Sequence, residues 1–436
     1  MPRKKKFKAL SGMRDIMPDE QPFWKKVEMV CEAMAFFYDF KKITTPIIEE
    51  EDLFVKGTGA TTDIVEKQMY SFKTKGGEKV VLRPEFTPSL VRVYIEKGLE
   101  GQPKPVKVWT LGPLFRYERP QKGRYRQFHQ FDFEIFGDKS PASDALMIQL
   151  FANLLENLGL KNWEIEVNSI GCKECRSGYK RKLKSFLKAN QRKLCADCKK
   201  RLQKNPLRVL DCKEEKCQRV KKLAPKITEY LCEECQKHYE KLIGYLKEMN
   251  LPFVENPYLV RGLDYYTRTV FEFVPAEKKE KRQTALIGGG RYDYLVEELG
   301  GKATPAVGGA GGIERIIEEM KEKKVNLVKI QISEDKFLEK PKVFLLHLGD
   351  LAKRKCFSLI EEFKKAKIKV RQNVAKDRLK AQLKWASRLN ADYTLILGEK
   401  EAKEGTIILR DMKTGIQKII PLKKVVSEVK KIMKKR

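Results

Sequence analysis

The chain has 436 residues, which is too long for one ordinary domain and predicts about three. Its 91 Lys and Arg exceed its 59 Asp and Glu by 32, and this excess favours a polyanionic partner, nucleic acid above all, over a cationic one. A hydrophobic content of 42% argues against wholesale disorder, and with no apolar run of ~18 residues and no apolar stretch after the basic N-terminus, we expect a cytoplasmic protein with no membrane partner.

The first third of the chain predicts a mixture of helix and strand. Apolar residues recur at helical spacing over Pro22–Phe40. Strands are expected at Lys79–Leu82, Val106–Leu111 and Arg126–Phe136.

The last of these strands alternates in a way that predicts a lined cleft. One face carries Phe128, Gln130, Asp132 and Glu134, and the other carries aromatic and aliphatic residues at the odd positions 131, 133 and 135. Polar residues on one strand face could also meet bulk solvent. A cleft is favoured because Phe128 shares that face.

The middle of the chain has a different texture. Residues 171–250 are rich in Lys, Glu and Cys and are predicted to be mostly helical. Strand signals then resume at Tyr258–Val274 and Thr284–Ile287, and a glycine-rich stretch runs to Gly312. Strand-forming sequence on both sides of this segment predicts a module inserted into a sheet-based domain.

The tail alternates strand and helix, which predicts a compact α/β domain. Helices are expected at Ala352–Ala366, at Leu379–Leu389 and at the C-terminus. Strands are expected at Val343–Leu348, Ile368–Asn373, Tyr393–Leu397, Thr406–Arg410 and Gln417–Pro421. From Pro341 to Arg436 there are 26 Lys and Arg against 10 Asp and Glu, a net charge of +16. Half of the chain's excess charge therefore lies in this segment.

Eight of the ten cysteines lie in the inserted segment as four close pairs. The pairs are Cys172 with Cys175, Cys195 with Cys198, Cys212 with Cys217, and Cys232 with Cys235. Such turns present two thiolates to one ion, and the C-x2-C-x19-C-x2-C of the first two pairs fits a four-thiolate zinc site. Two sites are conceivable, and the sequence does not choose among the three ways of matching the pairs. Structural zinc is favoured over disulfides, which a reducing cytosol opposes, and over inert thiols.

A basic hairpin is the strongest candidate for a site of chemistry. Residues 112–137 read GPLFRYERPQKGRYRQFHQFDFEIFG, with four arginines around a loop that contains Pro120 and Gly123. The planar guanidinium fork suits phosphate or carboxylate groups. No Walker P-loop or dinucleotide fingerprint occurs, so these residues alone predict only an anion site.

Several long motifs, in order, resemble the histidyl-tRNA synthetase family of class II aminoacyl-tRNA synthetases. FRYERPQKGRYRQFHQ (115–130) resembles motif 2, GIERI (312–316) resembles motif 3, and TTPIIEE (44–50) resembles the dimer-interface motif 1. LVRGLDYYTRTVFEF (259–273) and GGGRYDYLVEELGG (288–301) resemble the two histidine-specific blocks. LSGMRDIMP (10–18) and LRPEFTP (82–88) resemble the opening segment and the strand that holds the substrate amine.

The resemblance implies an α+β fold with a six-stranded antiparallel catalytic sheet. The catalytic domain would comprise residues 1–170 and 251–335, with an inserted Cys-rich helical domain at 171–250 and an anticodon-binding α/β domain at 336–436. The implied reaction activates histidine with ATP and Mg²⁺ to histidyl-adenylate, then transfers it to the 3′ end of tRNA(His). A homodimer is implied through motif 1, and structural Zn²⁺ would belong to the inserted domain.

The resemblance also implies roles for individual residues. Arg116 would bridge the histidine carboxylate and the α-phosphate, Arg261 would add a second positive charge there, and Arg315 would bind the distal phosphates. Phe128 would stack on adenine, with Glu118 and Arg124 in the ATP pocket. Arg119 and Gln121 would meet the tRNA acceptor end, which the inserted domain could also grip unless it is only a solvated spacer.

Histidine selection requires hydrogen-bonding groups for both ring nitrogens. By resemblance, Glu134 and Tyr266 would face the imidazole ring, whereas Glu85, Thr87 and Gln130 would hold the α-amine. Arg116 and Arg261 would complete this site. Tyr265 could be a ligand or a packing residue.

Two rival functions and one departure accompany this interpretation. The rivals are the synthetase-like regulatory subunit of ATP phosphoribosyltransferase and an RNA-binding module without catalysis, but the second predicts broken ATP residues. The departure is Gly309, where the family usually has phenylalanine in motif 3. We expect it to remove an apolar contact near the active site and to loosen a helix start, where glycine costs ~1 kcal/mol.

Overall fold

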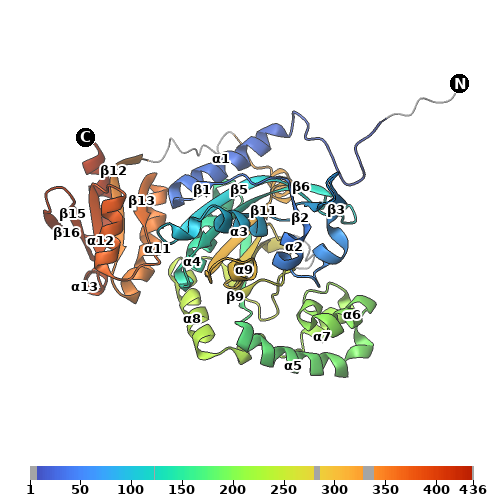
Figure 1. Cartoon of the computed structure of the whole chain (residues 1–436). Coiled ribbons are helices and arrows are strands. Elements are labelled where there is room, and N and C mark those ends of the chain that lie inside the picture. Colours follow the sequence, from blue (N-terminus) through green and yellow to red (C-terminus); the bar gives the residue numbers. More distant parts are fainter. Residues whose placement is uncertain (1–6, 122, 279–284, 328–337, 435–436) are drawn as a thin grey trace.

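The computed structural model describes residues 7–121, 123–278, 285–327 and 338–434. Figure 1 shows a large central sheet with helices on both sides, a helical module below it and a second α/β unit beside it. The expected boundary between 335 and 336 lies outside the described residues. Among the described helices, none combines the length and the apolar character that a bilayer crossing demands.

The central sheet has eight strands. Their order is β1 (Lys41–Lys42), β5 (Val106–Phe115), β6 (Gln127–Phe136), β11 (Ala306–Gly312), β10 (Ile287–Arg291), β9 (Thr267–Pro275), β7 (Trp163–Ser169) and β8 (Phe253–Glu255). The six strands from β5 to β7 pair antiparallel, which confirms the expected sheet. The two edge strands, β1 and β8, pair parallel with β5 and β7 and were not expected.

One face of this sheet is packed and the other is left open for a site. Helices α1 (Gln21–Tyr38), α4 (Pro141–Asn157) and α10 (Ile313–Glu322) cover the packed face. Phe131, Phe133 and Ile135 of β6 are fully buried there. Because strand side chains alternate, Phe128, Gln130 and the other even positions of β6 face the opposite side. The predicted cleft face of β6 is confirmed by Phe128, Gln130 and Asp132, which line pockets on this side of the sheet.

Smaller elements surround the open face. A three-stranded sheet has the order β2 (Ile48–Glu50), β4 (Lys79–Leu82) and β3 (Tyr70–Lys73). Three α-helices and a π-helical turn accompany it: α2 (Glu51–Thr58), α3 (Thr87–Glu96), α9 (Leu295–Glu298) and η1 (Ile64–Gln68). Short 3₁₀ turns lie at η2 (Leu99–Gly101) and η6 (Ala276–Lys278).

The segment between β7 and β8 is mostly helical, as predicted. Its helices are α5 (Lys173–Ala189), α6 (Ala196–Lys204), α7 (Glu215–Lys221) and α8 (Glu233–Glu248), with 3₁₀ turns η3 (Gln191–Lys193), η4 (Pro206–Val209) and η5 (Ile227–Tyr230). The last helix returns to the central sheet through a buried network. His238 Nε2 lies 2.7 Å from Asp144 Oδ2, and fully buried Arg291 also binds Asp144.

The C-terminal unit is a five-stranded sheet in the order β13 (Ile368–Gln372), β12 (Leu338–His347), β14 (Tyr393–Leu397), β15 (Thr406–Asp411) and β16 (Gln417–Pro421). Its helices are α11 (Asp350–Lys365), α12 (Leu379–Arg388), α13 (Glu399–Glu404) and α14 (Val425–Lys434), with a 3₁₀ turn η9 (Leu422–Lys424). Only the short α13 was not predicted. The unit rests on the central domain, where Gln149 Nε2 donates to Phe357 O at 3.1 Å.

One strand prediction is wrong in part. The strand expected at Tyr258–Val274 begins only at Thr267, and residues 258–266 form a loop. Pro257 lies in a tight turn at the start of the run, where the Leu259 amide donates to Asn256 O, and Gly262 interrupts the run. The strand expected at Thr284–Ile287 begins at Ile287, and Thr284 lies outside the described residues.

Candidate active site

Two adjoining pockets of about 260 and 270 Å³ lie on the open face of the central sheet. The first pocket includes Glu85, Thr87, Asp132, Tyr265 and Tyr266 in its lining. The second includes Phe128, Lys213, Glu272 and Arg315. Both are lined by Arg116, Glu118, Arg124, Gln130, Asp211, Arg261, Gly288 and Ala310. The two pockets are therefore halves of one cleft.

Buried carboxylates form the floor of the first pocket. Glu85 accepts hydrogen bonds from Thr58 Oγ1 at 2.5 Å and from the Tyr265 hydroxyl at 2.8 Å. Burial raises the pKa of Glu85. Tyr265 is thus both a pocket-lining residue and a partner of a site carboxylate.

Glu134 and Asp132 form a coupled pair beside this floor. Glu134 accepts from Thr87 Oγ1 at 2.8 Å and from the Tyr292 hydroxyl, and it lies behind the pocket lining. Burial raises the pKa of Glu134 to about 7, and burial together with the Glu134 charge raises that of Asp132 well above its usual value. Asp132 Oδ1 is buried, without a hydrogen-bond partner among the described residues. It lines the pocket and so is a group that a ligand can reach.

The raised pKa of Glu134 gives a stability prediction. Between about pH 4.5 and 7 the folded protein keeps a proton that the unfolded chain releases, so stability falls as pH rises through this window. Above pH 7 this contribution is constant. We expect Glu134→Gln to remove most of that slope, on the order of 2 kcal/mol, in urea unfolding followed from pH 5 to 8. Exposed Glu215→Gln is the control, and equal slopes in all three proteins would refute the prediction.

Three arginines converge on the cleft from three different elements. Arg116 follows β5, donates from Nε to Pro84 O at 2.9 Å and lies 5.2 Å from the Phe128 ring centroid. Arg261 comes from the 258–266 loop and pairs with Glu272, while its buried Nε has no partner among the described residues. Arg315 of α10 donates from Nε to Gly123 O at 3.0 Å. The pKa of Arg315 is lowered by burial and then by the like charge of Arg124.

The loop between β5 and β6 divides into a part inside the cleft and a part outside it. Arg124 pairs with Glu118 at 3.3 Å, and both side chains line the cleft. Arg119 and Gln121 are exposed and belong to neither pocket lining. The Gln121 and Arg124 backbones bond to each other and close the loop tip.

Two glycines allow side chains of the cleft to lie flat on the sheet. A Cβ at Gly288 would collide with the guanidinium of Arg261, and one at Gly308 would collide with the Glu134 carboxylate. Both glycines lie in paired strands, β10 and β11. The glycine-rich motifs therefore serve close approach of site side chains to the backbone.

The expectation for Gly309 is corrected by its position. It lies within β11, whereas α10 begins at Ile313, so it does not loosen a helix start. A Cβ at Gly309 would lie 2.7 Å from Cε2 of Phe151. Phe151 of α4 is fully buried and already occupies that space, so the packed face retains an aromatic ring there.

Several residues that line the cleft have no role in the motifs recognised from the sequence. Asp132 could have been found from the alternation of β6, which already placed it on the cleft face. Asp63, Arg208, Asp211 and Lys213 also line it, and the last three come from the inserted segment. No pattern in the sequence connects that segment to the cleft, because the contact depends on how the module folds back.

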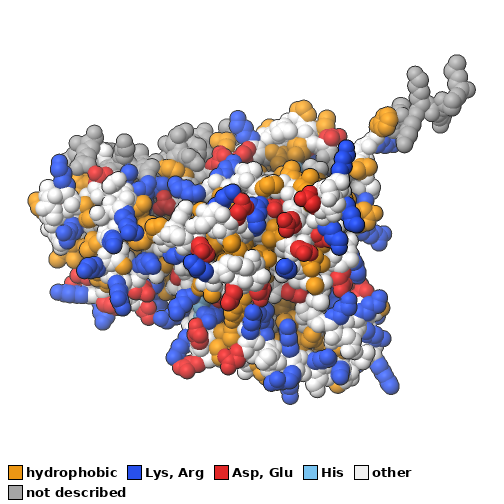
Figure 2. All heavy atoms as spheres, in the orientation of Figure 1, with side chains coloured by type: hydrophobic (Ala, Val, Ile, Leu, Met, Phe, Trp, Pro, Cys, Tyr) orange, Lys and Arg blue, Asp and Glu red, His pale blue; other side chains and the backbone are white. Residues whose placement is uncertain are grey.

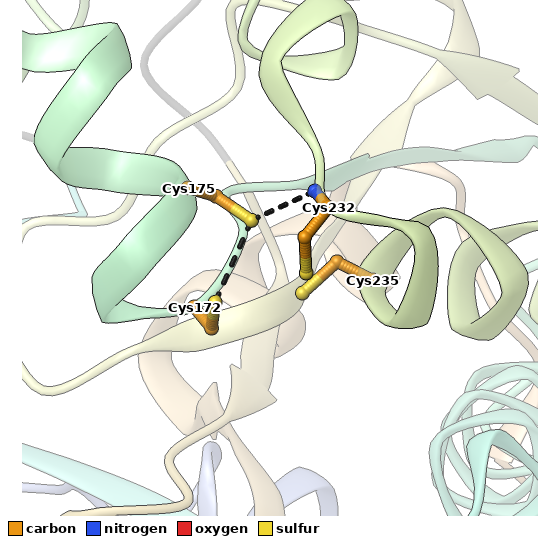
Figure 3. A group of neighbouring side chains, drawn as sticks. All are labelled: Cys172, Cys175, Cys232 and Cys235. Carbon is orange, nitrogen blue, oxygen red and sulfur yellow. Dashed lines mark hydrogen bonds between the residues drawn. The ribbon is translucent and has the colours of Figure 1, made fainter.

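The eight paired cysteines form two separate groups. Cys172, Cys175, Cys232 and Cys235 make the first, shown in Figure 3, where helix starts at both ends of the module direct four sulfurs together. Cys172 Sγ lies 3.5 Å from Cys175 Sγ, and the Cys232 amide donates to Cys175 Sγ at 3.1 Å. In each group the four sulfurs lie within 4.8 Å of one another.

Cys195, Cys198, Cys212 and Cys217 make the second group. Cys195 Sγ lies 3.8 Å from Cys212 Sγ, and the Cys195 amide donates to Cys217 Sγ at 3.2 Å. All ten cysteines are free thiols. The regular C-x2-C-x19-C-x2-C spacing is therefore misleading, since its two halves belong to different groups. Helix α5 lies between the first two pairs, and the first pair, Cys172 and Cys175, forms a group with the last pair, Cys232 and Cys235.

Comparisons with known proteins agree along the whole chain. A family model for histidyl-tRNA synthetase matches residues 12–316, and one for an anticodon-binding domain matches residues 342–432. Proteins named histidine–tRNA ligase from Dehalococcoides mccartyi and Halothermothrix orenii are each 44% identical to it, over 98% of this chain and 99% of their own.

Solved structures extend this result. Apo histidyl-tRNA synthetase from Staphylococcus aureus matches with a TM-score of 0.60 and 33% identity, over 97% of this chain and 99% of that one. The cleft, the antiparallel sheet and these matches lead to one conclusion. The chain belongs to the histidyl-tRNA synthetase family of class II aminoacyl-tRNA synthetases.

Proposed function

We propose that the chain acts as a histidine–tRNA ligase, which activates histidine with ATP and transfers it to the 3′ end of tRNA(His). One observation carries the proposal. Seven of the eight residues expected to bind histidine line the first pocket, and all five expected to bind ATP line the second. Glu134 is the exception, and it lies directly behind Thr87.

The cleft suits attack of a carboxylate on an α-phosphate. Two anions must approach and charge builds at phosphorus, so fixed cations are the main requirement. Arg116 and Arg261 line both pockets, and we assign them to the junction where carboxylate and α-phosphate meet. Arg315, which lines the second pocket but not the first, would bind the distal phosphates together with Arg124. Phe128 would stack on adenine.

Divalent metal belongs to this step as the companion of ATP. Carboxylate oxygens suit Mg²⁺, and the second pocket offers Glu118, Asp211 and Glu272. These carboxylates would hold Mg²⁺, which would supply neutralisation of the phosphate charge. Arg261 already pairs with Glu272, so Arg261 and the metal would both interact with the negative charge of Glu272.

Histidine recognition would use the carboxylates of the first pocket. Glu85, Thr87 and Gln130 are assigned to the α-amine, and Tyr266 to the imidazole. Because Asp132 rather than Glu134 lines the pocket, we propose that Asp132 meets the ring and that Glu134 sets its protonation. A hydrophobic amino acid would leave these buried groups unpaired, which rejects it strongly.

Both cysteine groups have the composition of structural zinc sites. Four thiols within 4.8 Å of one another match the all-cysteine tetrahedral set that holds zinc without an open position. We infer one Zn²⁺ in each group, with a structural role. Disulfides would need sulfurs about 2 Å apart, and the sulfur separations of 3.5 and 3.8 Å fit a shared ion better.

The chain would divide into parts with separate tasks. We propose a catalytic domain from residues 1–170 and 251–335, an inserted domain at 171–250 and an anticodon-binding domain at 336–436. The family models, which match 12–316 and 342–432, support the last division. Arg119 and Gln121, exposed beside the cleft, would contact the acceptor end of the tRNA.

The basic C-terminal unit supports binding of the tRNA backbone. Figure 2 shows Lys and Arg side chains spread over this unit and over the inserted module on the face drawn. Phosphate contacts release counterions, so affinity falls steeply with salt. Raising salt from 50 to 200 mM should raise KM for tRNA about tenfold or more in aminoacylation assays, and leave KM for histidine nearly unchanged. Equal changes in both would contradict this prediction.

A homodimer is also proposed, through the motif 1 segment. Ile47, Ile48 of β2 and Phe72 of β3 expose 42%, 49% and 43% of their surface. An apolar patch of this kind supports association. Sedimentation velocity should show a dimer of 50.6 kDa chains, and a monomer at micromolar concentration would exclude it.

The regulatory-subunit alternative is less well supported. A Bacillus halodurans chain described as an ATP phosphoribosyltransferase regulatory subunit/histidyl-tRNA synthetase matches with a TM-score of 0.52 at 19% identity, which shows a shared fold alone. Arg116, Glu118, Arg261 and Arg315 all line the cleft here, as catalysis requires. Charging of a tRNA(His) transcript with labelled histidine tests the proposal, and a folded protein that binds histidine but charges nothing would favour the alternative.

A further inference from the structure

The second cysteine group lies beside the cleft, in contrast to the first. Between Cys198 and Cys212 the chain leaves α6, passes through η4 and crosses toward the loops around the first pocket. Arg201 and Arg208 both pair with Asp63, at 2.9 and 2.8 Å. Asn205 Nδ2 donates to Asp264 Oδ1 at 3.0 Å. This crossing segment thus connects the module to the loops at 59–64 and 258–266.

Cys212 is the point at which the cysteine group and the cleft meet. Its sulfur belongs to the second group, and the residues before and after it in the chain face the cleft instead. Asp211 lines both pockets and Lys213 lines the second. A bond from a metal to Cys212 would therefore fix the backbone that carries both charged side chains.

Charge explains what these side chains would do. Lys213 shares the second pocket with Arg124 and Arg315, the cations assigned to phosphate, so it adds a cation at the same end. Asp211 lies among the arginines of the cleft and balances their charge before ATP arrives. Both belong to a short segment with irregular backbone, and neither is held by a strand or a long helix.

We propose that Zn²⁺ bound by Cys195, Cys198, Cys212 and Cys217 positions Lys213 and Asp211 at the second pocket, so that occupancy of this site controls ATP binding. The inference rests on the function proposed above. Without the ion, α6, α7 and the crossing segment would lose their common anchor, because each of them carries at least one of the four cysteines.

The first group offers a matched comparison within the same module. It ties Cys172 and Cys175 at the entrance to Cys232 and Cys235 at the exit. None of these four cysteines is next in sequence to a residue that lines either pocket. Its ion would stabilise the module without acting on ATP.

The first arm of the test compares one cysteine from each group. Cys217→Ser and Cys232→Ser are purified beside the wild type, zinc per chain is measured by mass spectrometry of the metal, and KM for ATP is measured by histidine-dependent ATP–pyrophosphate exchange. We expect two zinc ions in the wild type and one in each variant. KM for ATP should rise about tenfold in Cys217→Ser alone. The proposal is overturned by a wild type without zinc, or by a Cys217→Ser protein that has lost the ion of the second cysteine group but keeps the wild-type KM for ATP.

The second arm does not depend on folding without metal. Lys213→Met should keep both zinc ions and raise KM for ATP about tenfold, with KM for histidine little changed. Lys216→Met, which removes an exposed lysine of the same module outside both pockets, is the control. Equal ATP constants in the two variants would overturn the positioning role. Absence of exchange in the wild type would instead count against the proposed function.

Discussion

Arg261→Ala should lower kcat/KM for histidine in ATP–pyrophosphate exchange by ~10³-fold or more, or ~4 kcal/mol of transition-state stabilisation. Arg261 lines both pockets, and its buried Nε has no partner among the described residues, so a ligand can accept a hydrogen bond from it. Its charge lies where two anions must meet. Arg261→Lys keeps the charge but loses the planar fork, and should recover only part of the rate.

The controls separate chemistry from folding. Glu272 is half-buried and would lose its partner in Arg261→Ala, so the double variant with Glu272→Gln removes that cost. Arg388→Ala, an exposed change in α12, should leave exchange unaffected. A near-normal exchange rate in a folded Arg261→Ala protein would remove this arginine from the mechanism.

Gly288→Ala should lower kcat/KM for histidine in ATP–pyrophosphate exchange by ~10²-fold or more, because it displaces Arg261 without removing its charge. The new Cβ would meet the guanidinium of Arg261, which lies flat on this glycine, and would push it from the cleft. Displacement of a catalytic group by about 1 Å commonly costs this much. The measurement is exchange kinetics with varied histidine and varied ATP.

Gly178→Ala is the matched glycine control. Gly178 lies in α5, and a Cβ there would meet no atom within 4 Å. Alanine should stabilise that helix by ~1 kcal/mol and leave activity intact. If both glycine variants kept full activity, the close approach of Arg261 to β10 would have no role in catalysis.

Local signals predicted most of the C-terminal unit and several elements of the first third, because each of these depends on nearby residues, but they missed α2, α3 and α4. β4, β14 and β16 begin and end where expected, and the alternation of β6 identified its buried and cleft faces. Pairs of cysteines were visible for the same reason. Arg116 and Arg124 belong to the basic hairpin that predicted an anion site, whereas Arg261 and Arg315 came from motif resemblance.

What the sequence could not supply depends on the path of the chain in space. The matching of cysteine pairs follows from α5 and α8 meeting at the base of the module, which no spacing encodes. Asp211 and Lys213 reach the cleft only because the module folds back. Gly309 was misjudged because its neighbour Phe151 lies 158 positions away in the chain.

The central claim is that this cleft activates histidine. ATP–pyrophosphate exchange with purified protein, Mg²⁺ and each of the twenty amino acids in turn tests it most directly. We predict exchange with histidine and none above background with the other nineteen. Exchange with a different amino acid, or no exchange from a folded protein that binds histidine, would contradict the account.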